Sequence, residues 1–422
     1  MKILWIVNTI FPSPSIAMGL NPPVVGGWMY GLAAQLSESE SISLAVVTTY
    51  SGKEIKKLEL DNIDYYLLPC KDQSKYDKSL EDKWERVCTE FEPDVIHIHG
   101  TEYAHGMACM KKLPNLKYVV SIQGLVGVCE RYYYAGISQN DFLKNITFRD
   151  IVKWNSVFGG RRNFKKRGII EREYINRTQN VIGRTSWDYT HAKAINPKVN
   201  YHFCNETLRD GFYTADKWSF DKCKPHTIFL SQAGYPIKGL HQVLKALVIL
   251  KDMYPNIKVR VGGSNIIKSS TLLDKLKLSG YGKYIKRLIK ENSLENHIEF
   301  LGALTEEEMI KEYLKSNVFI CPSSIENSPN SVGEAQLLGV PVIASYVGGV
   351  ADMVEDGKTG HLYRFEEVEM LAILIDKVFS MQEEQLSILG KNATEVALKR
   401  HNPYTNAKRM IEIYKNARNN NN

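Results

Sequence analysis

Cysteine is scarce in this chain, and none of it is paired in sequence. The 422 residues include seven cysteines and no C-x-x-C motif. They stand at positions 70, 88, 109, 129, 204, 223 and 321. Disulfide frameworks and zinc sites use clustered cysteines. Neither is therefore expected, and a reducing cytoplasm is the expected compartment.

Long apolar runs are also missing. A helix that spans a bilayer needs ~20 consecutive apolar residues, and no stretch approaches that length. The N-terminus, MKILWIVNTIFPSPS, has a short apolar run that prolines interrupt, without the longer apolar core of a secretory signal. It is expected to form a first β-strand. The expected location is cytoplasmic, at most peripheral at the inner face of the cell membrane.

Acidic residues are under-represented in one part of the chain. Residues 1–100 carry 9 Lys and Arg against 14 Asp and Glu, whereas residues 101–200 carry 17 against 7. The densest basic region, residues 153–177, has 8 basic and 2 acidic residues and contains GGRRNFKKRG. It is either a solvated loop or a surface for an anionic partner such as a membrane. Nucleic acid is not an expected partner, because no aromatic platform or helix-turn-helix pattern accompanies it.

Short apolar runs alternate with longer helical patterns along the chain. Runs such as KILWIVNT, DVIHIH, HTIFLSQ and VFICPSS are almost continuously apolar, which is typical of parallel strands covered on both faces. Helical patterns such as WMYGLAAQLSES and GLHQVLKALVILKDMYP lie between them. This βαβα rhythm predicts an α/β fold with doubly wound, Rossmann-like parallel sheets.

The rhythm starts again near residue 225, which predicts two domains. Residues 208–226 lose the apolar periodicity and gather Asp, Lys and Pro, as a linker does. We therefore predict an N-terminal domain at 1–215, a second domain at 225–395, and a C-terminal helix at 396–418 that crosses back to the first. Ligands of such sheets bind at the carboxyl ends of the strands. The loops that follow the strands are therefore the candidate sites.

Three of these loops contain glycines that could bring backbone amides close to an anion. They are Gly26-Gly27 before a helical pattern, Lys238-Gly239 in FLSQAGYPIKG before another, and Gly262-Gly263 at the end of KVRVGG. The start of a helix favours negative charge, and glycine permits close approach. For each pair a simple turn is the alternative, and an exposed lysine is most often only solvated.

The segment SIENSPNSVGEAQLLGVPVIAS, residues 324–345, holds two glutamates eight positions apart. Ser331 and Glu334 fit an S-x-x-E capping box, in which each side chain binds a backbone amide at the helix start. Glu326 lies in the preceding loop, where a carboxylate has no evident structural duty. Two carboxylates beside such a loop suit the hydroxyls of a sugar, and the helix start between them suits phosphate.

This segment resembles the donor-binding end of the retaining GT-B glycosyltransferases of family 4, the glycosyltransferase group 1 type. The resemblance rests on the E-x7-E pair, the following A-x-L-L-G-V-P-V-I-A-S, Gly348-Gly349 and VEDGKTGHLY, and it is strongest over residues 225–365. It implies two Rossmann-like domains with an interdomain cleft. It also implies transfer of a sugar from a nucleotide-diphosphate sugar to a glycan acceptor, expected to be lipid-linked, in bacterial surface polysaccharide biosynthesis.

The resemblance further implies roles for individual residues. Glu334 would bind the ribose, Glu326 the transferred sugar, and Lys238 the leaving diphosphate. The remaining donor-binding residues would be Gly26, Gly27, Gly262, Gly263, Asn330, Ser331 and Val332. No metal or other cofactor is implied, and a UDP-sugar is slightly favoured over a GDP-sugar as the donor. The basic residues 153–177 would lie in the acceptor-binding domain and meet an anionic membrane.

Two departures from the family pattern leave alternatives open. The phosphate-binding lysine lacks its usual neighbouring arginine, and Arg184 is the predicted substitute. Many members have a histidine near the sugar, where this chain has Gln123, which joins Glu326 and Lys238 as a candidate catalytic residue. A glutamine can bind a hydroxyl but cannot take a proton. The alternatives are a non-catalytic nucleotide-sugar-binding partner subunit and a GT-B sugar-nucleotide epimerase.

Three histidines in DVIHIHGTEYAHG invite a metal-site hypothesis. His97, His99 and His105 lie in and just after a predicted strand. We expect them to be strand and cleft-lining residues rather than metal ligands.

Overall fold

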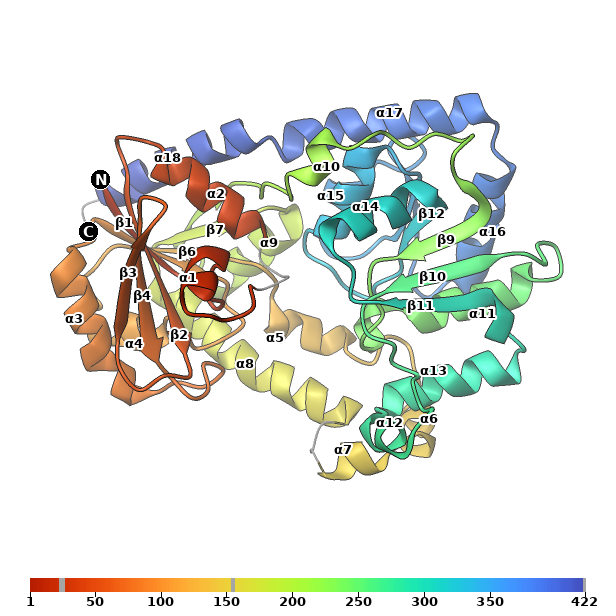
Figure 1. The fold of residues 1–422 in the computed structure, drawn as a ribbon, viewed down its shortest axis with the longest axis horizontal. Coiled ribbons are helices and arrows are strands. Elements are labelled where there is room, and N and C mark those ends of the chain that lie inside the picture. The colour runs from red at the N-terminus through yellow and green to blue at the C-terminus, as the bar shows by residue number, and fades with distance from the viewer. Residues whose placement is uncertain (23–26, 153–155, 420–422) are drawn as a thin grey trace. The chain divides into compact units, whose positions relative to one another are not determined.

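The computed structural model describes residues 1–22, 27–152 and 156–419, and the chain forms two units (Figure 1). Unit 1 comprises Met1–Val128, Lys165–Arg209 and His401–Asn422, and unit 2 comprises Cys129–Phe164 and Asp210–Arg400. Each unit is built on one sheet. The long helix α8 (Val157–Arg177) passes from unit 2 into unit 1.

Unit 1 contains an eight-stranded sheet in the order β3-β4-β2-β1-β5-β6-β7-β8. Its strands are β1 (Lys2–Ile6), β2 (Ser43–Tyr50), β3 (Lys56–Leu60), β4 (Ile63–Pro69), β5 (Val95–His99), β6 (Tyr118–Ser121), β7 (Asn180–Gly183) and β8 (Asn200–Phe203). All pairs are parallel except the edge pair β3 and β4. Strands β3 and β8 escaped the sequence-based prediction because their side chains are largely exposed and polar, without an apolar run.

Helices cover both faces of the unit 1 sheet, and each face has its own apolar cluster. The helices are α1 (Pro12–Ala17), α2 (Gly27–Ser37), η1 (Lys78–Leu80), α3 (Glu81–Phe91), α4 (Met107–Lys112), α5 (Val126–Cys129), α9 (Ser186–Ile195) and α18 (Pro403–Asn419). The C-terminal helix α18 belongs to this unit because Trp5 Nε1 donates to the Tyr414 hydroxyl at 2.8 Å in the core.

Unit 2 contains a six-stranded sheet in the order β11-β10-β9-β12-β13-β14, and every pair is parallel. Its strands are β9 (Lys224–Leu230), β10 (Lys258–Gly262), β11 (Ile298–Gly302), β12 (Ser316–Cys321), β13 (Val342–Ser345) and β14 (His361–Tyr363). The order reverses between β9 and β12. In an open α/β sheet this reversal places the loops after the two central strands side by side.

The helices of unit 2 lie on both faces of its sheet (Figure 1). They are η2 (Glu130–Tyr132), α6 (Gln139–Lys144), α7 (Phe148–Val152), α10 (Gly211–Thr214), η3 (Pro236–Lys238), α11 (Leu240–Leu250), α12 (Leu272–Lys277), α13 (Gly280–Glu291), η4 (Glu295–His297), α14 (Glu306–Lys315), α15 (Asn330–Leu338), η5 (Val350–Asp352), α16 (Val368–Ser380) and α17 (Glu383–Arg400). Within the described ranges, no helix combines the length and apolar character needed to cross a bilayer.

Unit 2 includes residues 129–164, which the predicted boundary at 215 assigned to the N-terminal domain. Two contacts with distant residues explain the difference. The Ala135 carbonyl accepts from His241 Nε2 at 2.8 Å, and Asp141 pairs with Arg287 at 2.6 Å. Both contacts join residues more than a hundred positions apart. No local pattern in the sequence indicates them.

Candidate functional site

The loops after β9 and β12 meet at the point where the unit 2 sheet reverses its order. The loop after β9 ends in η3 and Gly239, which has a φ of +71°. A Cβ atom on Gly239 would lie 1.7 Å from the Pro322 carbonyl oxygen in the loop after β12. Only glycine accepts both this conformation and this approach. The glycine therefore lets Lys238 reach the neighbouring loop.

Lys238 and Glu326 form an ion pair across these two loops. The Lys238 Nζ lies 2.5 Å from Glu326 Oε1, and the two side chains are 14% and 15% exposed. Ser323 Oγ donates to the same Oε1 at 2.7 Å. Burial is the largest single influence on the pKa of Lys238 and lowers it, but the charge and hydrogen bond of Glu326, together with Tyr235 and Cys321, outweigh burial and raise the pKa. Lys238 is therefore a cation, and Glu326 has the structural partner that the sequence did not indicate.

The backbone of Glu326 is held by Gly348 and Gly349. The amide of Gly349 donates to the Glu326 carbonyl at 3.0 Å. A Cβ atom on Gly348, whose φ is +52°, would lie 1.9 Å from the same oxygen. The loop after β13 thus closes on the loop after β12 only because a glycine stands there. The two glycines that follow the E-x7-E pair in the sequence thus contact the backbone of its first glutamate.

The predicted capping box of Ser331 and Glu334 is wrong. The N-cap of α15 is Pro329, without a side-chain capping bond, and Ser331 lies inside the first turn. The Ser331 carbonyl instead accepts from the Tyr313 hydroxyl at 2.9 Å, and Glu334 Oε2 lies 3.5 Å from that hydroxyl. Helix α15 follows Pro329 and begins at Asn330, one residue before Ser331. The side chain of Ser331 is therefore inside the first turn and not at the N-cap position that a capping box requires.

The first turn of α15 presents backbone amides beside the ion pair's loop. The Val332 amide donates to the Pro329 carbonyl at 3.0 Å, so it is already used. The amides of Asn330 and Ser331 precede it, and a helix provides no internal acceptor for its first amides. Of the three residues predicted to hold a diphosphate or sugar, the geometry therefore favours these two.

Gly262 and Gly263 lie where β10 meets its neighbours. A Cβ atom on Gly262 would lie 2.8 Å from the Ser231 carbonyl in the loop after β9, and the Gly263 amide donates to the Gly302 carbonyl at 2.8 Å. These contacts give the pair a packing role at the carboxyl edge of the sheet. Its predicted contact with a donor stays a prediction.

The predicted residues of unit 1 lie at the corresponding edge of its sheet. Gly26 lies outside the described residues, and Gly27 is the first residue of α2. Gln123 follows β6, and its carbonyl accepts from Arg184 Nη2 at 2.7 Å. Arg184 is buried, and its Nη1 pairs with Glu206 at 2.5 Å. The structure thus shows Arg184 joining two segments of unit 1, and its predicted role as a phosphate ligand stays a prediction.

The three histidines are buried and neutral. Within the described chain, no group of three or more His, Cys, Asp or Glu side chains is placed to hold a metal ion. Burial lowers the pKa of His97 to about 3 and of His105 to about 4, and it lowers that of His99 as well. The hydroxyl of Tyr414 accepts from Trp5 Nε1 and lies 2.7 Å from His97 Nδ1. The other ring nitrogen of His97, Nε2, lies 2.6 Å from the hydroxyl oxygen of Ser121, so both nitrogens have a hydrogen-bond partner in the core.

Sequence reasoning missed two carboxylates at the same edge of unit 1. Glu102 Oε1 accepts from the Gly124 amide at 3.0 Å, beside Gln123. Glu171, on α8, accepts from the Val126 and Gly127 amides at 2.7 and 3.1 Å. Burial raises the pKa of Glu171 to about 8, although these amides oppose the shift. Single glutamates on a loop and a helix gave no sequence signal, because only folding gathers these amides around them.

The basic region at 153–177 forms the helix α8 from residue 157 onward, not a loop. Residues 153–155 lie outside the described residues. Arg161 Nε pairs with Glu130 at 2.6 Å, and Arg167 Nε donates to the Glu102 carbonyl at 2.6 Å. Arg162, Lys165 and Lys166 are exposed. Part of the basic cluster therefore secures the helix, and part faces solvent.

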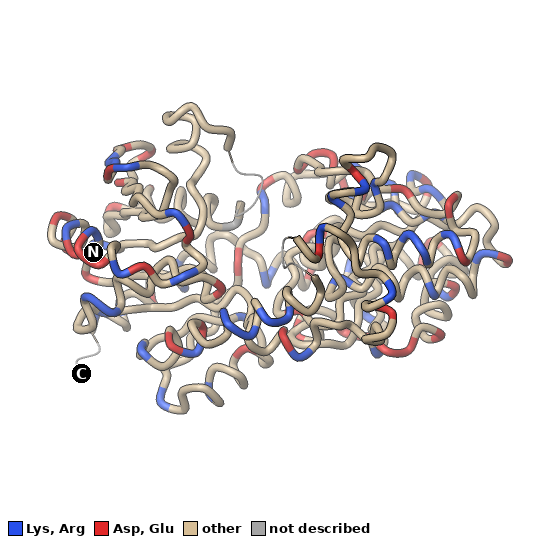
Figure 2. The backbone as a smooth tube through the Cα atoms, turned by 90° about the horizontal axis from the view of Figure 1, so that it is seen from below, with Lys and Arg blue, Asp and Glu red and all other residues tan. Residues whose placement is uncertain are grey.

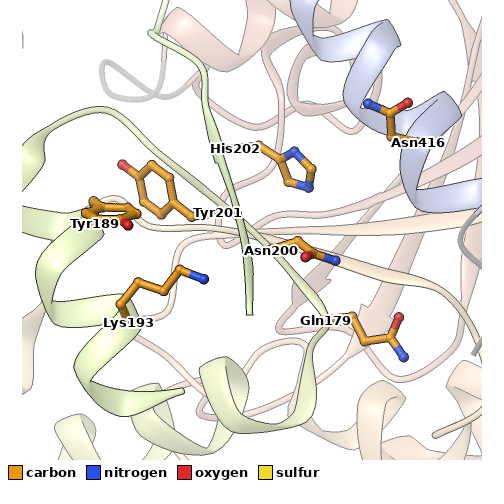
Figure 3. A pocket seen from close by; sticks show the side chains of 7 residues that line it. All are labelled: Gln179, Tyr189, Lys193, Asn200, Tyr201, His202 and Asn416. Carbon is orange, nitrogen blue, oxygen red and sulfur yellow. The ribbon is translucent and has the colours of Figure 1, made fainter. Parts of the chain in front are cut away.

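A separate polar hollow of about 730 Å³ lies in unit 1 (Figure 3). It is lined by Gln179, Tyr189, Lys193, Asn200, Tyr201, His202 and Asn416. Gln179 and Asn200 lie at the amino ends of β7 and β8. The hollow is thus at the edge of the sheet opposite Gln123, where open α/β sheets do not usually bind ligands.

Comparison with solved structures defines the fold class. The structure of Anabaena Alr3699/HepE in complex with UDP and glucose matches with a TM-score of 0.65 at 17% identity, over 98% of this chain and 99% of that one. The two parallel-sheet α/β units together with this likeness show the GT-B fold of glycosyltransferases, and they confirm the predicted fold class.

The family follows from sequence. Residues 214–396 match the family model described as glycosyl transferases group 1. The matched segment contains the E-x7-E pair and confirms its resemblance to the glycosyltransferase group 1 type. The matched segment falls within unit 2, which holds Lys238, Glu326 and Glu334.

Two curated relatives show how far the sequence likeness extends. D-inositol 3-phosphate glycosyltransferase of Corynebacterium urealyticum is 26% identical over 186 residues, which are 42% of this chain and 40% of that protein. The amylovoran biosynthesis glycosyltransferase AmsK of Erwinia amylovora is 23% identical over 187 residues, 41% of this chain and 46% of that protein. The chain thus matches less than half the length of either relative.

Proposed function

We propose that the protein is a retaining, metal-independent hexosyltransferase that moves a sugar from a nucleotide-diphosphate sugar to a hydroxyl of a glycan. The observation that carries the proposal is the Lys238–Glu326 ion pair beside the first turn of α15. It lies where the order of the unit 2 sheet reverses, the usual ligand site of such sheets.

The chemistry follows from the charges of this site. The leaving nucleotide diphosphate gains negative charge as the sugar departs, and Lys238 and the amino end of α15 both favour negative charge. Both side-chain bonds of Glu326 end on Oε1. We therefore propose that the other carboxylate oxygen of Glu326, Oε2, accepts a hydrogen bond from a hydroxyl of the sugar. Glu334, four residues into α15, is proposed to bind the ribose.

The relatives support finer parts of the proposal. The solved HepE structure holds UDP and glucose, which supports a UDP-sugar as donor. AmsK is named for amylovoran biosynthesis, which supports a polysaccharide pathway. We propose a lipid-linked glycan acceptor at the inner face of the cell membrane, where the exposed basic residues of α8 would meet anionic lipid.

A thermal-shift panel of UDP, GDP, ADP, CMP and their sugar conjugates, with and without EDTA, tests the donor site. A ligand at ~100 times its dissociation constant adds ~2.7 kcal/mol to the free energy of unfolding of the unit that binds it. We expect a shift for the uridine nucleotides that EDTA does not change and that Glu334→Ala abolishes. Glu312→Ala is the matched control, because Glu312 is a buried carboxylate of unit 2 that pairs with Arg260 away from these loops.

The outcomes separate the hypotheses. No shift with any nucleotide contradicts the donor site. A shift that EDTA removes contradicts metal independence. Binding without turnover or slow donor hydrolysis would favour a non-catalytic binding subunit. Release of a new nucleotide sugar without an acceptor would favour an epimerase.

A further inference from the structure

Helices α7 and α12 of unit 2 contact each other (Figure 1). Both carry large apolar side chains that are exposed. Phe148, Ile151, Val152, Leu272 and Leu273 are 59% to 74% exposed. We call these five side chains the α7–α12 face. Globular proteins seldom expose contiguous apolar patches, and when they do, the patch often binds a partner or a membrane.

Polar contacts hold this face in place from behind. Asp150 Oδ2 accepts from the Thr147 amide at 3.1 Å at the start of α7. A Cβ atom on Gly280, the first residue of α13, would lie 2.6 Å from the same Oδ2. Lys283 Nζ, also on α13, donates to the Lys144 carbonyl at 3.4 Å. Asp150 of α7 thus lies against the start of α13, and α13 also binds the end of α6, whereas the apolar side chains of α7 are exposed.

The surroundings of the face are strongly basic. Residues 268–290 contain seven Lys and Arg and a single acid, Asp274 (Figure 2, Lys and Arg in blue). Asp274 caps α12 by accepting from the Thr271 amide at 3.2 Å. The nearby Asp141 pairs with Arg287 at 2.6 Å. Both acids are therefore engaged in local bonds.

The lysines that remain around the face point to solvent. The exposed ones are Lys144, Lys268, Lys275, Lys277, Lys283, Lys286 and Lys290. Several of these make local bonds, but none is buried. The rim of the apolar face thus carries excess positive charge.

A second exposed apolar group in unit 2 shows that charge distinguishes the α7–α12 face. Ile249 of α11, the adjacent Met253, and Met370 and Ile373 of α16 are 48% to 65% exposed, and α11 contacts α16. Helix α16 carries two acids, at 369 and 376, against one lysine at 377. Apolar exposure is therefore similar in the two places, whereas an excess of positive charge surrounds only the first of the two.

We propose that the α7–α12 face docks on an anionic membrane surface, with its apolar side chains in the interfacial layer and its lysines at the lipid phosphates. Combined apolar burial and attraction of basic residues to anionic lipid is how peripheral proteins hold a bilayer. Two copies of this face would bring like charges together, which disfavours self-association. The inference deepens the membrane partner of the proposed function and rests on that function for its setting.

Liposome flotation of the full chain tests the face. We expect flotation with vesicles of phosphatidylcholine and phosphatidylglycerol, and little with phosphatidylcholine alone. Replacing four side chains, Phe148→Ser, Ile151→Ser, Leu272→Ser and Leu273→Ser, should weaken partitioning at least about tenfold. The matched control, Ile249→Ser, Met253→Ser, Met370→Ser and Ile373→Ser, removes similar apolar exposure from α11 and α16 and should float like the wild type. Melting temperature verifies that both variants fold.

The charge component needs its own variant. Lys275→Gln, Lys277→Gln and Lys290→Gln should weaken binding to anionic vesicles by about fivefold for each lysine. Arg162→Gln, Lys165→Gln and Lys166→Gln on α8 should have the smaller effect. Wild-type flotation that inorganic phosphate abolishes at constant ionic strength would overturn the proposal in favour of a free-anion site.

Three further results would overturn it. They are no flotation of the wild type, equal flotation of the face variant, and self-association in sedimentation that only the face variant loses. Loss of flotation in the α8 variant alone would assign the membrane to α8 instead. Because nucleotide thermal shifts are measured without lipid, a failure of the donor site and a failure of this face are distinguishable.

Discussion

The two units use the carboxyl edges of their sheets in different ways. In unit 2, the loops after β9 and β12 bring together a lysine and a glutamate of opposite charge. In unit 1, the same edge gathers the carboxylates of Glu102 and Glu171 around backbone amides, while neutral histidines fill the strand β5 behind them. The edge of unit 2 therefore presents a charged ion pair. At the edge of unit 1, burial determines whether the side chains are charged.

This difference explains why the family match is confined to one unit. In unit 2, two loops bring Lys238 and Glu326 together, and their close approach requires Gly239. These residues stand in short segments that the sequence analysis singled out. The edge of unit 1 relies on residues from a loop, from α8 and from the C-terminal helix. A sequence pattern can describe the first arrangement, but it cannot describe the second.

The largest expected effect is the dependence of each unit's stability on pH. His97, His99 and His105 of unit 1 are neutral in the folded state, with lowered pKa values, whereas unfolded histidines gain protons below about pH 6.5. The unfolded chain then binds more protons at these histidines, which lowers the stability of unit 1 as the pH drops below about 6.5, by up to about 1.4 kcal/mol per pH unit and histidine. Glu171 and Glu102, whose pKa values are raised, bind protons in the folded state and offset part of this loss. Among the described residues of unit 2, burial also lowers the pKa values of His241 and His361.

Hydrogen exchange resolved by unit measures this contrast. Peptides from β5 and β6 should lose protection as the pH falls below about 6.5, and peptides from β9 and β12 show whether unit 2 does so at the same pH. The same protein near neutral pH is the reference. Parallel loss of protection in both units would remove the contrast between them.

The next effect concerns turnover at the edge of unit 2. Lys238→Met removes the cation proposed to meet the leaving diphosphate, and electrostatic groups of this kind contribute roughly a hundred- to a thousandfold in turnover. We expect that loss in kcat with an assayed donor and acceptor. Arg260→Met is the matched control, because it breaks the partly buried pair with Glu312 in the same unit. If both variants lose turnover equally, the loss reflects stability and not the site.

The smallest effect tests the glycine that brings the two loops together. Gly239→Ala places a Cβ against the Pro322 carbonyl as well as at a positive φ, so it should lower the free energy of unfolding by about 2–4 kcal/mol and displace Lys238. Gly357→Ala is its control, since Gly357 has a φ of +74° and no atom within 4 Å of a Cβ. The control should lose about 1 kcal/mol. Chemical denaturation compares them, and equal losses would contradict the close-approach argument.

Much of unit 2 could be predicted from its sequence. The predicted helical pattern GLHQVLKALVILKDMYP and the predicted strands HTIFLSQ and VFICPSS correspond to α11, β9 and β12 of the structure. Apolar periodicity and glycine positions are local properties, and these elements are formed by local rules. The predicted capping box failed because a proline shifted the helix start, and the predicted loop at GGRRNFKKRG is a helix because Tyr133 and Glu130 pack against it.

The sequence by itself determined the α/β class, the family of residues 214–396 and the charged residues of the unit 2 loops, because each depends on residue type and spacing within a short segment. Only the tertiary structure decided that Glu326 pairs with Lys238, that residues 129–164 belong to unit 2, and that the apolar side chains of α7 and α12 share one basic surface. These depend on contacts between residues far apart in the chain. Such contacts form when apolar faces are buried together, and they leave no periodic pattern in the sequence.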